Sequence, residues 1–188
     1  NNCTLANCTA RDNGGAGFNL GISCIISGCA AFNNSMQGIF TNGVCTVIDC
    51  ASYSNSSHGI QTDDACTIDR CNASGNEGDG IRVPSDCVVR NNTCFSNGSG
   101  ASDGAAIYAT SSDNRIEGNT CTNSDRGIDV DAAGNFIARN VASGNTVNWS
   151  IVAGNVCLVT SATTGGAING NSGGVGPGST DPNANFTY

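Results

Sequence analysis

The sequence is short of the residues that favour helices. Its 188 residues include no lysine, one methionine, three leucines and two glutamates, Glu77 and Glu117. All seven basic residues are arginine. This scarcity of helix formers excludes a helical bundle, a coiled coil and a doubly wound α/β fold. Because 38% of the residues are hydrophobic and only 12% are charged, the chain is also too apolar for a disordered protein.

Positive charge and long apolar runs are also missing. Fifteen acidic residues against seven basic ones give a formal net charge of −8 and a pI near 4.2. Such a balance argues against a nucleic-acid partner and against an anionic membrane surface. No apolar run approaches the roughly 20 residues that a membrane helix needs. We therefore expect a chain that neither binds nucleic acid nor spans a membrane with a helix.

Cysteine, by contrast, is abundant and regularly spaced. Twelve cysteines occur, and nine of them fall into two columns with a period of 21 residues. The first column is Cys3, Cys24, Cys45, Cys66 and Cys87, and the second is Cys8, Cys29, Cys50 and Cys71. A fixed period near 20 residues is typical of a solenoid, in which each repeat stacks on the next.

Each repeat contains three short stretches of alternating residues, which predict three β-strands per coil. Asn, Gly, Asp and Ser lie between the stretches, where turns are needed. We predict about eight coils of roughly 21 residues over 1–160, with equal positions stacked in columns about 4.8 Å apart. The Gly-rich tail, 161–188, ends in Phe186 and Tyr188, and we expect it to cap the last coil or to contact another subunit.

One column of the predicted coils consists of asparagine. Its members are Asn13, Asn34, Asn55, Asn76, Asn97 and Asn145. The wider pattern N-x-I-x-G-N-x…N…G-I-x-V is clearest in 114–130, NRIEGNTCTNSDRGIDV. It resembles the right-handed parallel β-helix repeat of the pectate-lyase-like superfamily, including its NosD-like branch, over about 1–160. The resemblance implies a secreted or cell-surface protein. It implies no single activity, since the superfamily includes lyases, hydrolases, epimerases, phage spikes and adhesins.

The repeat also limits what the cysteines do. Within one coil, Cys-x4-Cys spans a strand, which places the two sulfurs too far apart for a disulfide. Between coils, either a ladder of buried thiols or partial bridging fits, and the ladder is favoured because parallel Cβ directions strain a bridge. Cys94 and Cys121 share a column in adjacent coils and are the best candidates for a bridge. No Cys-x-x-Cys pair occurs and histidine is nearly absent, so we expect no zinc.

Candidate site residues cluster on the Gly-Ile-x strand of each repeat. Its outward column is Asn19, Phe40, Gln61, Arg82, Tyr108, Asp129 and Ser150. Phe40, Arg82, Tyr108 and Asp129 are candidates for carbohydrate binding, because arginine pairs with carboxylates and aromatic rings stack on sugars. The longer fifth coil, with its extra residues around 98–104, is expected to border this face.

The sequence offers fewer signals for catalytic and metal-binding residues than for carbohydrate-binding ones. Arg82, Asp129 and His58 are the catalytic candidates, although His58 is better interpreted as a turn residue before Gly59. Asp129 with Asp131 is a candidate calcium pair, and no other cofactor is expected. The catalytic motifs of enzymes in this superfamily are not found intact in the sequence. No Arg-x-Lys follows His58, and the Asp-Pro-His-Asp motif of alginate epimerases is absent.

Two classes of function follow. The first is an extracellular structural or adhesive β-solenoid, which stacks end to end into fibres and contacts polysaccharide. It is favoured by short regular coils and by the lack of a convincing catalytic cluster. Because residues 1–3 are already in repeat register, we expect a removed leader or missing upstream coils. The alternative is a polysaccharide lyase, epimerase or glycosidase that uses the Arg82, Tyr108 and Asp129 face.

Overall fold

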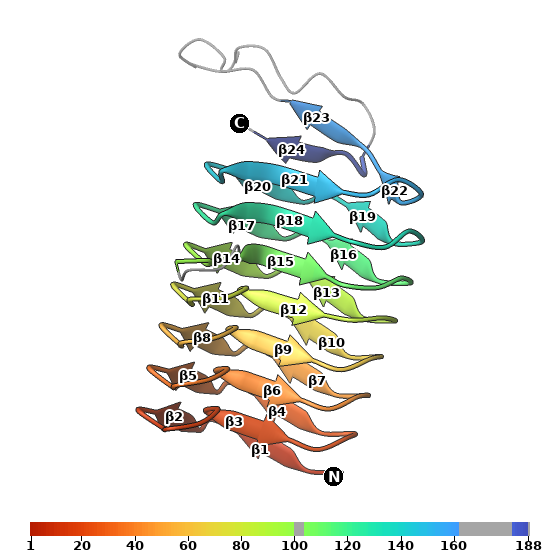
Figure 1. Cartoon of the computed structure of the whole chain (residues 1–188). Helices are drawn as coiled ribbons and strands as arrows, with labels where there is room; N and C mark the ends of the chain where they lie inside the picture. Colours follow the sequence, from red (N-terminus) through yellow and green to blue (C-terminus); the bar gives the residue numbers. More distant parts are fainter. Residues whose placement is uncertain (100–103, 162–181, 188) are drawn as a thin grey trace, which may run out of the picture.

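The computed structural model describes residues 1–99, 104–161 and 182–187. Within these residues the chain forms 24 β-strands and no helix. The strands belong to three parallel sheets that surround a narrow apolar interior (Figure 1). The predicted all-β parallel solenoid, with three strands in a coil of about 21 residues, is therefore confirmed.

Each sheet takes one strand from each coil. Sheet A contains β1 (Thr4–Ala6), β4 (Ile25–Ser27), β7 (Thr46–Ile48), β10 (Thr67–Asp69), β13 (Val88–Arg90), β16 (Arg115–Glu117), β19 (Phe136–Ala138) and β22 (Val156–Cys157). Sheet B contains β2 (Thr9–Arg11), β5 (Ala30–Phe32), β8 (Ala51–Tyr53), β11 (Asn72–Ser74), β14 (Thr93–Phe95), β17 (Thr120–Thr122), β20 (Val141–Ser143), β24 (Asn185–Thr187) and β23 (Val159–Ser161). Sheet C contains β3 (Phe18–Leu20), β6 (Ile39–Thr41), β9 (Ile60–Thr62), β12 (Ile81–Val83), β15 (Ala105–Ala109), β18 (Arg126–Val130) and β21 (Val147–Ile151).

Seven coils are complete, because sheet C has seven strands, whereas about eight were predicted. The eighth begins with β22 in sheet A. In sheet B, two further strands follow β20 of the seventh coil, and β24 lies between β20 and β23. The last described strand therefore inserts between the seventh coil and β23. If the strands stacked in sequence order, β23 would pair directly with β20. The boundary predicted at residue 160 stays a prediction.

Strand alternation places one residue of most three-residue strands in the core. Ile26, Val47, Ile68, Val89, Ile116 and Ile137 form the interior column of sheet A, each almost fully buried. Ile39, Ile60, Ile81, Ile107 and Ile128 form the corresponding column of sheet C. Between sheets A and B the chain turns within two residues, the first of which has positive φ, as at Asn7 (φ 55) and Gly28 (φ 60). Such left-handed corners suit Asn, Asp and Gly.

The two cysteine columns lie at the corners and are buried except at the first coil. In the first column the backbone N–H groups of Cys24, Cys45 and Cys66 donate to the sulfur one coil further along, as Cys24 does to Cys45 Sγ at 3.2 Å. Where the column changes to asparagine, the Cys87 N–H donates to Asn114 Oδ1 at 2.9 Å. The bonding pattern is unchanged, so cysteine and asparagine serve as equivalents there.

All twelve cysteines are free thiols in the structure. Cys94 and Cys121 are direct neighbours in β14 and β17 and fully buried, as the column predicted, but no disulfide joins them. Burial raises the pKa of the Cys87 thiol to about 11. The hydrogen bond of Cys94 to Cys121, together with burial, raises the pKa of Cys94 well above its usual value. The structure therefore agrees with a ladder of buried thiols rather than with bridging.

The asparagine column forms a hydrogen-bonded ladder at the corner between sheets B and C. From Asn13 to Asn76, each side-chain amide donates to the Oδ1 of the next asparagine, as Asn55 Nδ2 does to Asn76 Oδ1 at 2.9 Å. Ser124 takes the asparagine position in the sixth coil, where its hydroxyl accepts the Asn97 N–H at 3.1 Å. The column therefore passes through a serine that the repeat alignment omitted. Among the described residues, no helix has the length and apolar character that a membrane crossing requires.

Candidate functional site

The outer face of sheet C gathers the polar side chains that the sequence singled out. The predicted column is in register from one strand to the next. It runs through Asn19, Phe40, Gln61, Arg82, Tyr108, Asp129 and Ser150. These residues point outward because the apolar residues beside them in each strand pack into or against the core. The register is confirmed, whereas the roles assigned to these residues stay predictions.

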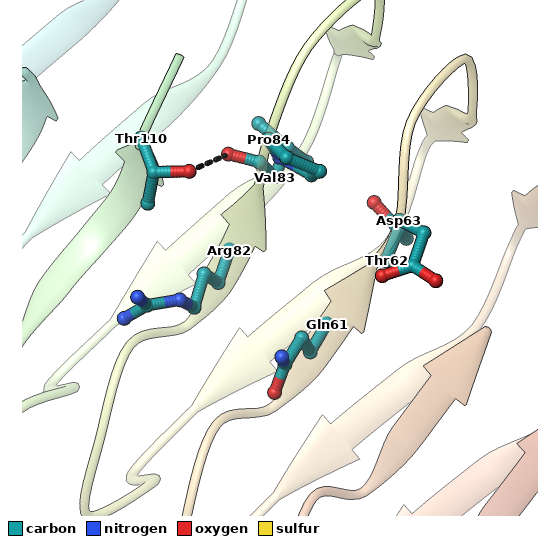
Figure 2. A pocket seen from close by; sticks show the side chains of 7 residues that line it. All are labelled: Gln61, Thr62, Asp63, Arg82, Val83, Pro84 and Thr110. Atoms are coloured by element: carbon teal, nitrogen blue, oxygen red, sulfur yellow. Dashed lines mark hydrogen bonds between the residues drawn. The ribbon is translucent and has the colours of Figure 1, made fainter. Parts of the chain in front are cut away.

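Two hollows lie on this face. One, of about 180 Å³, is lined by Gln61, Thr62, Asp63, Arg82, Val83, Pro84 and Thr110. Figure 2 shows Gln61 and Arg82 beside it on neighbouring strands, with Thr110 bonded to the Val83 carbonyl oxygen. The other, of about 430 Å³, lies at β3 and β6 and is lined by Gly15, Ala16, Asn19, Met36, Gln37 and Phe40. The face thus has a polar hollow near its middle and a more apolar one towards the N-terminus.

His58 contacts Asp79 at the edge of sheet C. The two residues occupy equivalent positions in adjacent coils, 21 residues apart. His58 Nδ1 lies 3.0 Å from the backbone nitrogen of Asp79 and 3.1 Å from its Oδ2. The neutral ring accepts the backbone N–H, and a ring protonated at Nδ1 donates to the carboxylate. Asp79 therefore holds the His58 ring through both its backbone N–H and its carboxylate.

The Asp79 carboxylate is nearly buried and is held by several donors. Only 5% of its side chain is exposed. Its Oδ1 accepts the Ala105 N–H at 2.8 Å, and its Oδ2 accepts a hydrogen bond from Arg82 at 3.3 Å. These donors offset the cost of burying a carboxylate. Asp79 thus links His58 to Arg82, and so connects the edge of the sheet to its central column.

Tyr108 continues the connection from Arg82. The Arg82 guanidinium lies 4.7 Å from the centroid of the Tyr108 ring, a cation–π arrangement. The Tyr108 hydroxyl donates to Asp131 Oδ2 at 2.5 Å. This hydrogen bond, with a smaller contribution from burial, raises the pKa of Tyr108 to about 12. His58, Asp79, Arg82, Tyr108 and Asp131 therefore form one connected chain of contacts across the face, which we call the sheet C network.

Asp129 lies beside this network but is almost fully covered. Only 4% of its side chain is exposed, and its Oδ2 accepts a hydrogen bond from Arg126 at 2.7 Å. Its Oδ1 is buried and has no hydrogen-bond partner. An unpaired buried carboxylate oxygen is costly, so this atom marks a place where a donor group would be favourable.

The predicted calcium pair gains no support from this geometry. Asp129 is bonded to Arg126, and Asp131 is bonded to Tyr108. In the part of the chain that the structure describes, no three His, Cys, Asp or Glu side chains converge as a metal site would need. The face carries four carboxylates, from Asp63, Asp79, Asp129 and Asp131, against the guanidinium groups of Arg82 and Arg126. It is therefore net negative, like the chain as a whole.

Sequence reasoning missed Asp79 and Arg126. A signal was available for Asp79, because it lies one 21-residue period after His58. Asp64, which follows His58 more closely in the chain, accepts hydrogen bonds from Ser85 instead. Of the expanded loop at 98–104, residues 100–103 lie outside the described residues.

Comparison with known proteins supports the fold. The family model described as a right-handed beta helix region matches residues 1–147. Among curated proteins, no sequence matches this chain.

Two solved structures share this architecture. The A-module of mannuronan C-5 epimerase AlgE4 from Azotobacter vinelandii is 16% identical, with a TM-score of 0.61 over 81% of this chain. The AlgE6 A-module from the same organism is also 16% identical, with a TM-score of 0.57 over 81% of this chain. The chain spans 56% and 57% of the length of these two modules. At this identity, the likeness concerns the fold alone.

Proposed function

The chain belongs to the right-handed beta helix family, and from this premise we propose that it binds and modifies a polysaccharide along the outer face of sheet C. The observation that carries the proposal is the sheet C network, in which Arg82 lines the polar hollow. The similarity to modules of polysaccharide epimerases supports it, because their names identify them as proteins that modify a polymer of this class.

In this proposal each member of the network has a distinct role. His58 transfers a proton to or from the bound sugar, and Asp79 orients and supports the ring in both of its charge states. Arg82 and the Tyr108 ring contact the sugar next to the hollow, while Asp131 holds the Tyr108 hydroxyl. We place the reaction outside the cell or at its surface, where such polymers are found.

The test is a turnover assay on a panel of polymers that includes alginate, polygalacturonate and neutral glycans. Products are followed by ultraviolet absorbance for lyase activity, reducing ends for hydrolysis, and proton NMR for epimerisation. We expect turnover of at least one polymer and its loss in His58→Gln and Arg82→Ala. Arg115→Ala is the matched control, because it removes an exposed arginine from sheet A. Unchanged turnover in His58→Gln would show that His58 does not transfer the proton.

A structural or adhesive rod is the second candidate, and the regularity of the coils favours it. The 21-residue period holds in four consecutive coils, and strands pair in register along all three sheets. A rod of this kind stacks end to end on copies of itself and holds polysaccharide without changing it. Binding without turnover on every polymer, together with filaments in electron micrographs, would favour this candidate over the enzyme.

A further inference from the structure

Sheet B carries exposed aromatic rings that the sheet C network does not use. Its outward column runs in register through Arg11, Phe32, Tyr53, Ser74, Phe95, Thr122 and Ser143. Strands β5, β8, β11 and β14, which carry the aromatic part of this column, lie one above another in Figure 1. Tyr53 is 37% exposed and Phe95 is 46% exposed. Large aromatic groups left in solvent at aligned positions indicate a surface with a partner.

The rings are spaced by the solenoid itself. Phe32 and Tyr53 are stacked, with centroids 4.8 Å apart and planes 4° from parallel. This separation matches the spacing of coils, so the rings stack along the axis of the rod. Tyr53 therefore has one face covered by Phe32, and its other face is directed towards the coil of Ser74.

Ser74 is the small residue between two aromatic ones. It pairs with Tyr53 on one side and with Phe95 on the other. Tyr53 and Phe95 are thus two coil spacings apart, about 10 Å. The aromatic column is thus interrupted at Ser74, between Tyr53 and Phe95, and we call this interruption the Ser74 slot.

In the two outward columns of sheet B, the residues at the Ser74 slot are uncharged. The second outward column of the sheet is Thr9, Ala30, Ala51, Asn72, Thr93, Thr120 and Val141. In these two columns Arg11 is the one charged residue, and it lies three coils from Ser74. Asn72 and Thr93 border the slot and offer an amide and a hydroxyl to a ligand.

We propose that the Ser74 slot is a second glycan-binding site and that its ligand is a neutral sugar unit of a polysaccharide. A pyranose ring has apolar C–H groups on its faces, which stack on aromatic rings, and hydroxyls at its rim, which reach Ser74, Asn72 and Thr93. The absence of a cationic side chain in the slot, on a chain of net charge −8, disfavours an anionic sugar. A single slot is too small for a stable contact with a second copy of the chain, which needs about 1,000 Å².

The test measures binding of neutral hexasaccharides, cellohexaose and laminarihexaose, by calorimetry. The decisive variant is Ser74→Phe, which places a ring between Tyr53 and Phe95 and fills the slot. The column already accepts aromatic residues, so the fold should tolerate it. Thr122→Phe adds the same ring beyond Phe95, outside the slot, and is the matched control. We expect affinity roughly tenfold lower in Ser74→Phe and in Tyr53→Ser, and unchanged in Thr122→Phe.

Several outcomes would overturn the proposal. They are no binding of either neutral hexasaccharide, equal binding by Ser74→Phe, and equal or tighter binding of hexagalacturonate. Self-association that is lost in Ser74→Phe would instead assign the slot to a second copy. The sheet C site is tested separately, because Ser74→Phe should leave turnover of polysaccharide unchanged if both proposals hold.

Discussion

Cysteine and asparagine perform the same task at the corners of this solenoid. Such a corner side chain accepts an N–H from the equivalent residue one coil earlier. It also donates to a carbonyl oxygen of the coil before, 24 residues back or, across the longer fifth coil, 30 residues back. Cys71 Sγ donates to the Val47 carbonyl oxygen at 3.6 Å, and Asn92 Nδ2 donates to the Ile68 carbonyl oxygen at 3.1 Å. The thiol fits because it is small, apolar enough to be buried and able to act as both a weak donor and a weak acceptor.

This equivalence predicts how a corner cysteine responds to substitution. Cys66→Ala should lower the free energy of unfolding by about 1–3 kcal/mol, because the buried N–H of Cys45 loses its acceptor. Cys66→Asn should cost less, since asparagine supplies both the acceptor and the donor. Urea unfolding followed by circular dichroism measures the difference. Equal losses in both variants would show that packing of the sulfur matters more than its hydrogen bonds.

The Tyr108 hydroxyl provides a second prediction at the residue scale. Its pKa is raised to about 12 chiefly by the hydrogen bond to Asp131, above the ordinary value of about 10. The stability that this bond contributes is therefore complete below about pH 10 and is lost as the pH rises through about 12. Asp131→Asn should move the tyrosinate absorbance transition of Tyr108 to lower pH. The measurement uses a background in which Tyr53 and Tyr188 are replaced by phenylalanine. Tyr108 is then the sole tyrosine, and the transition is its own.

At the scale of the element, the Gly-Ile strands of sheet C depend on close approach between coils. A Cβ added at Gly80 would lie 2.6 Å from the Ala106 carbonyl oxygen and 2.6 Å from Asn97 Nδ2. The glycine is therefore needed because the neighbouring coil and the asparagine ladder occupy that space. The motif was visible in the sequence as a repeat, whereas the reason for it is a contact between coils.

The corresponding prediction compares two glycines. Gly80→Ala should lower the free energy of unfolding by about 1–3 kcal/mol, because the backbone of the neighbouring coil must move. Gly14→Ala is the matched control, since a Cβ there would meet nothing within 4 Å. Its effect should stay within about 0.5 kcal/mol. Similar thermal midpoints for the two variants would contradict the close contact at Gly80.

Strand positions could be predicted well, and the functional face only in part. The 21-residue period aligned Arg82, Tyr108 and Asp129 in one column, and their backbone register is as expected. The contact between His58 and Asp79 was not predicted, because periodicity identifies columns but does not identify which side chains bend towards each other. The Tyr108 contact with Asp131 was missed for the same reason.

At the scale of the whole molecule, a solenoid depends mainly on contacts between neighbouring coils. Loss of a contact at one end should therefore loosen that end and leave distant coils intact. The C-terminal end is held by β24, which extends the corner ladder with Asn185. The N–H and the side-chain amide of Asn140 both donate to Asn185 Oδ1, at 2.8 and 2.9 Å.

Asn185→Ala tests this local character. Without the Asn185 oxygen, both Asn140 donors lose their acceptor, so amide hydrogens of β19 and β20 should exchange faster. Amides of β4 and β5, at the other end of the rod, should keep their protection. Hydrogen exchange read by mass spectrometry compares the two regions. A uniform rise along the chain would show that the molecule unfolds as one cooperative unit.

The sequence by itself determined the solenoid, its period and the residues that face outward. It did so because a parallel stack repeats the same environment in every coil, and the same residue types therefore recur. Tertiary structure decided the rest: the free state of the thiols, the insertion of β24, the sheet C network and the Ser74 slot. Each of these depends on which side chains meet across coils or on a strand that returns from far along the chain. The period in the sequence shows which positions stack, but it does not show which of the stacked side chains bond or where a distant strand returns.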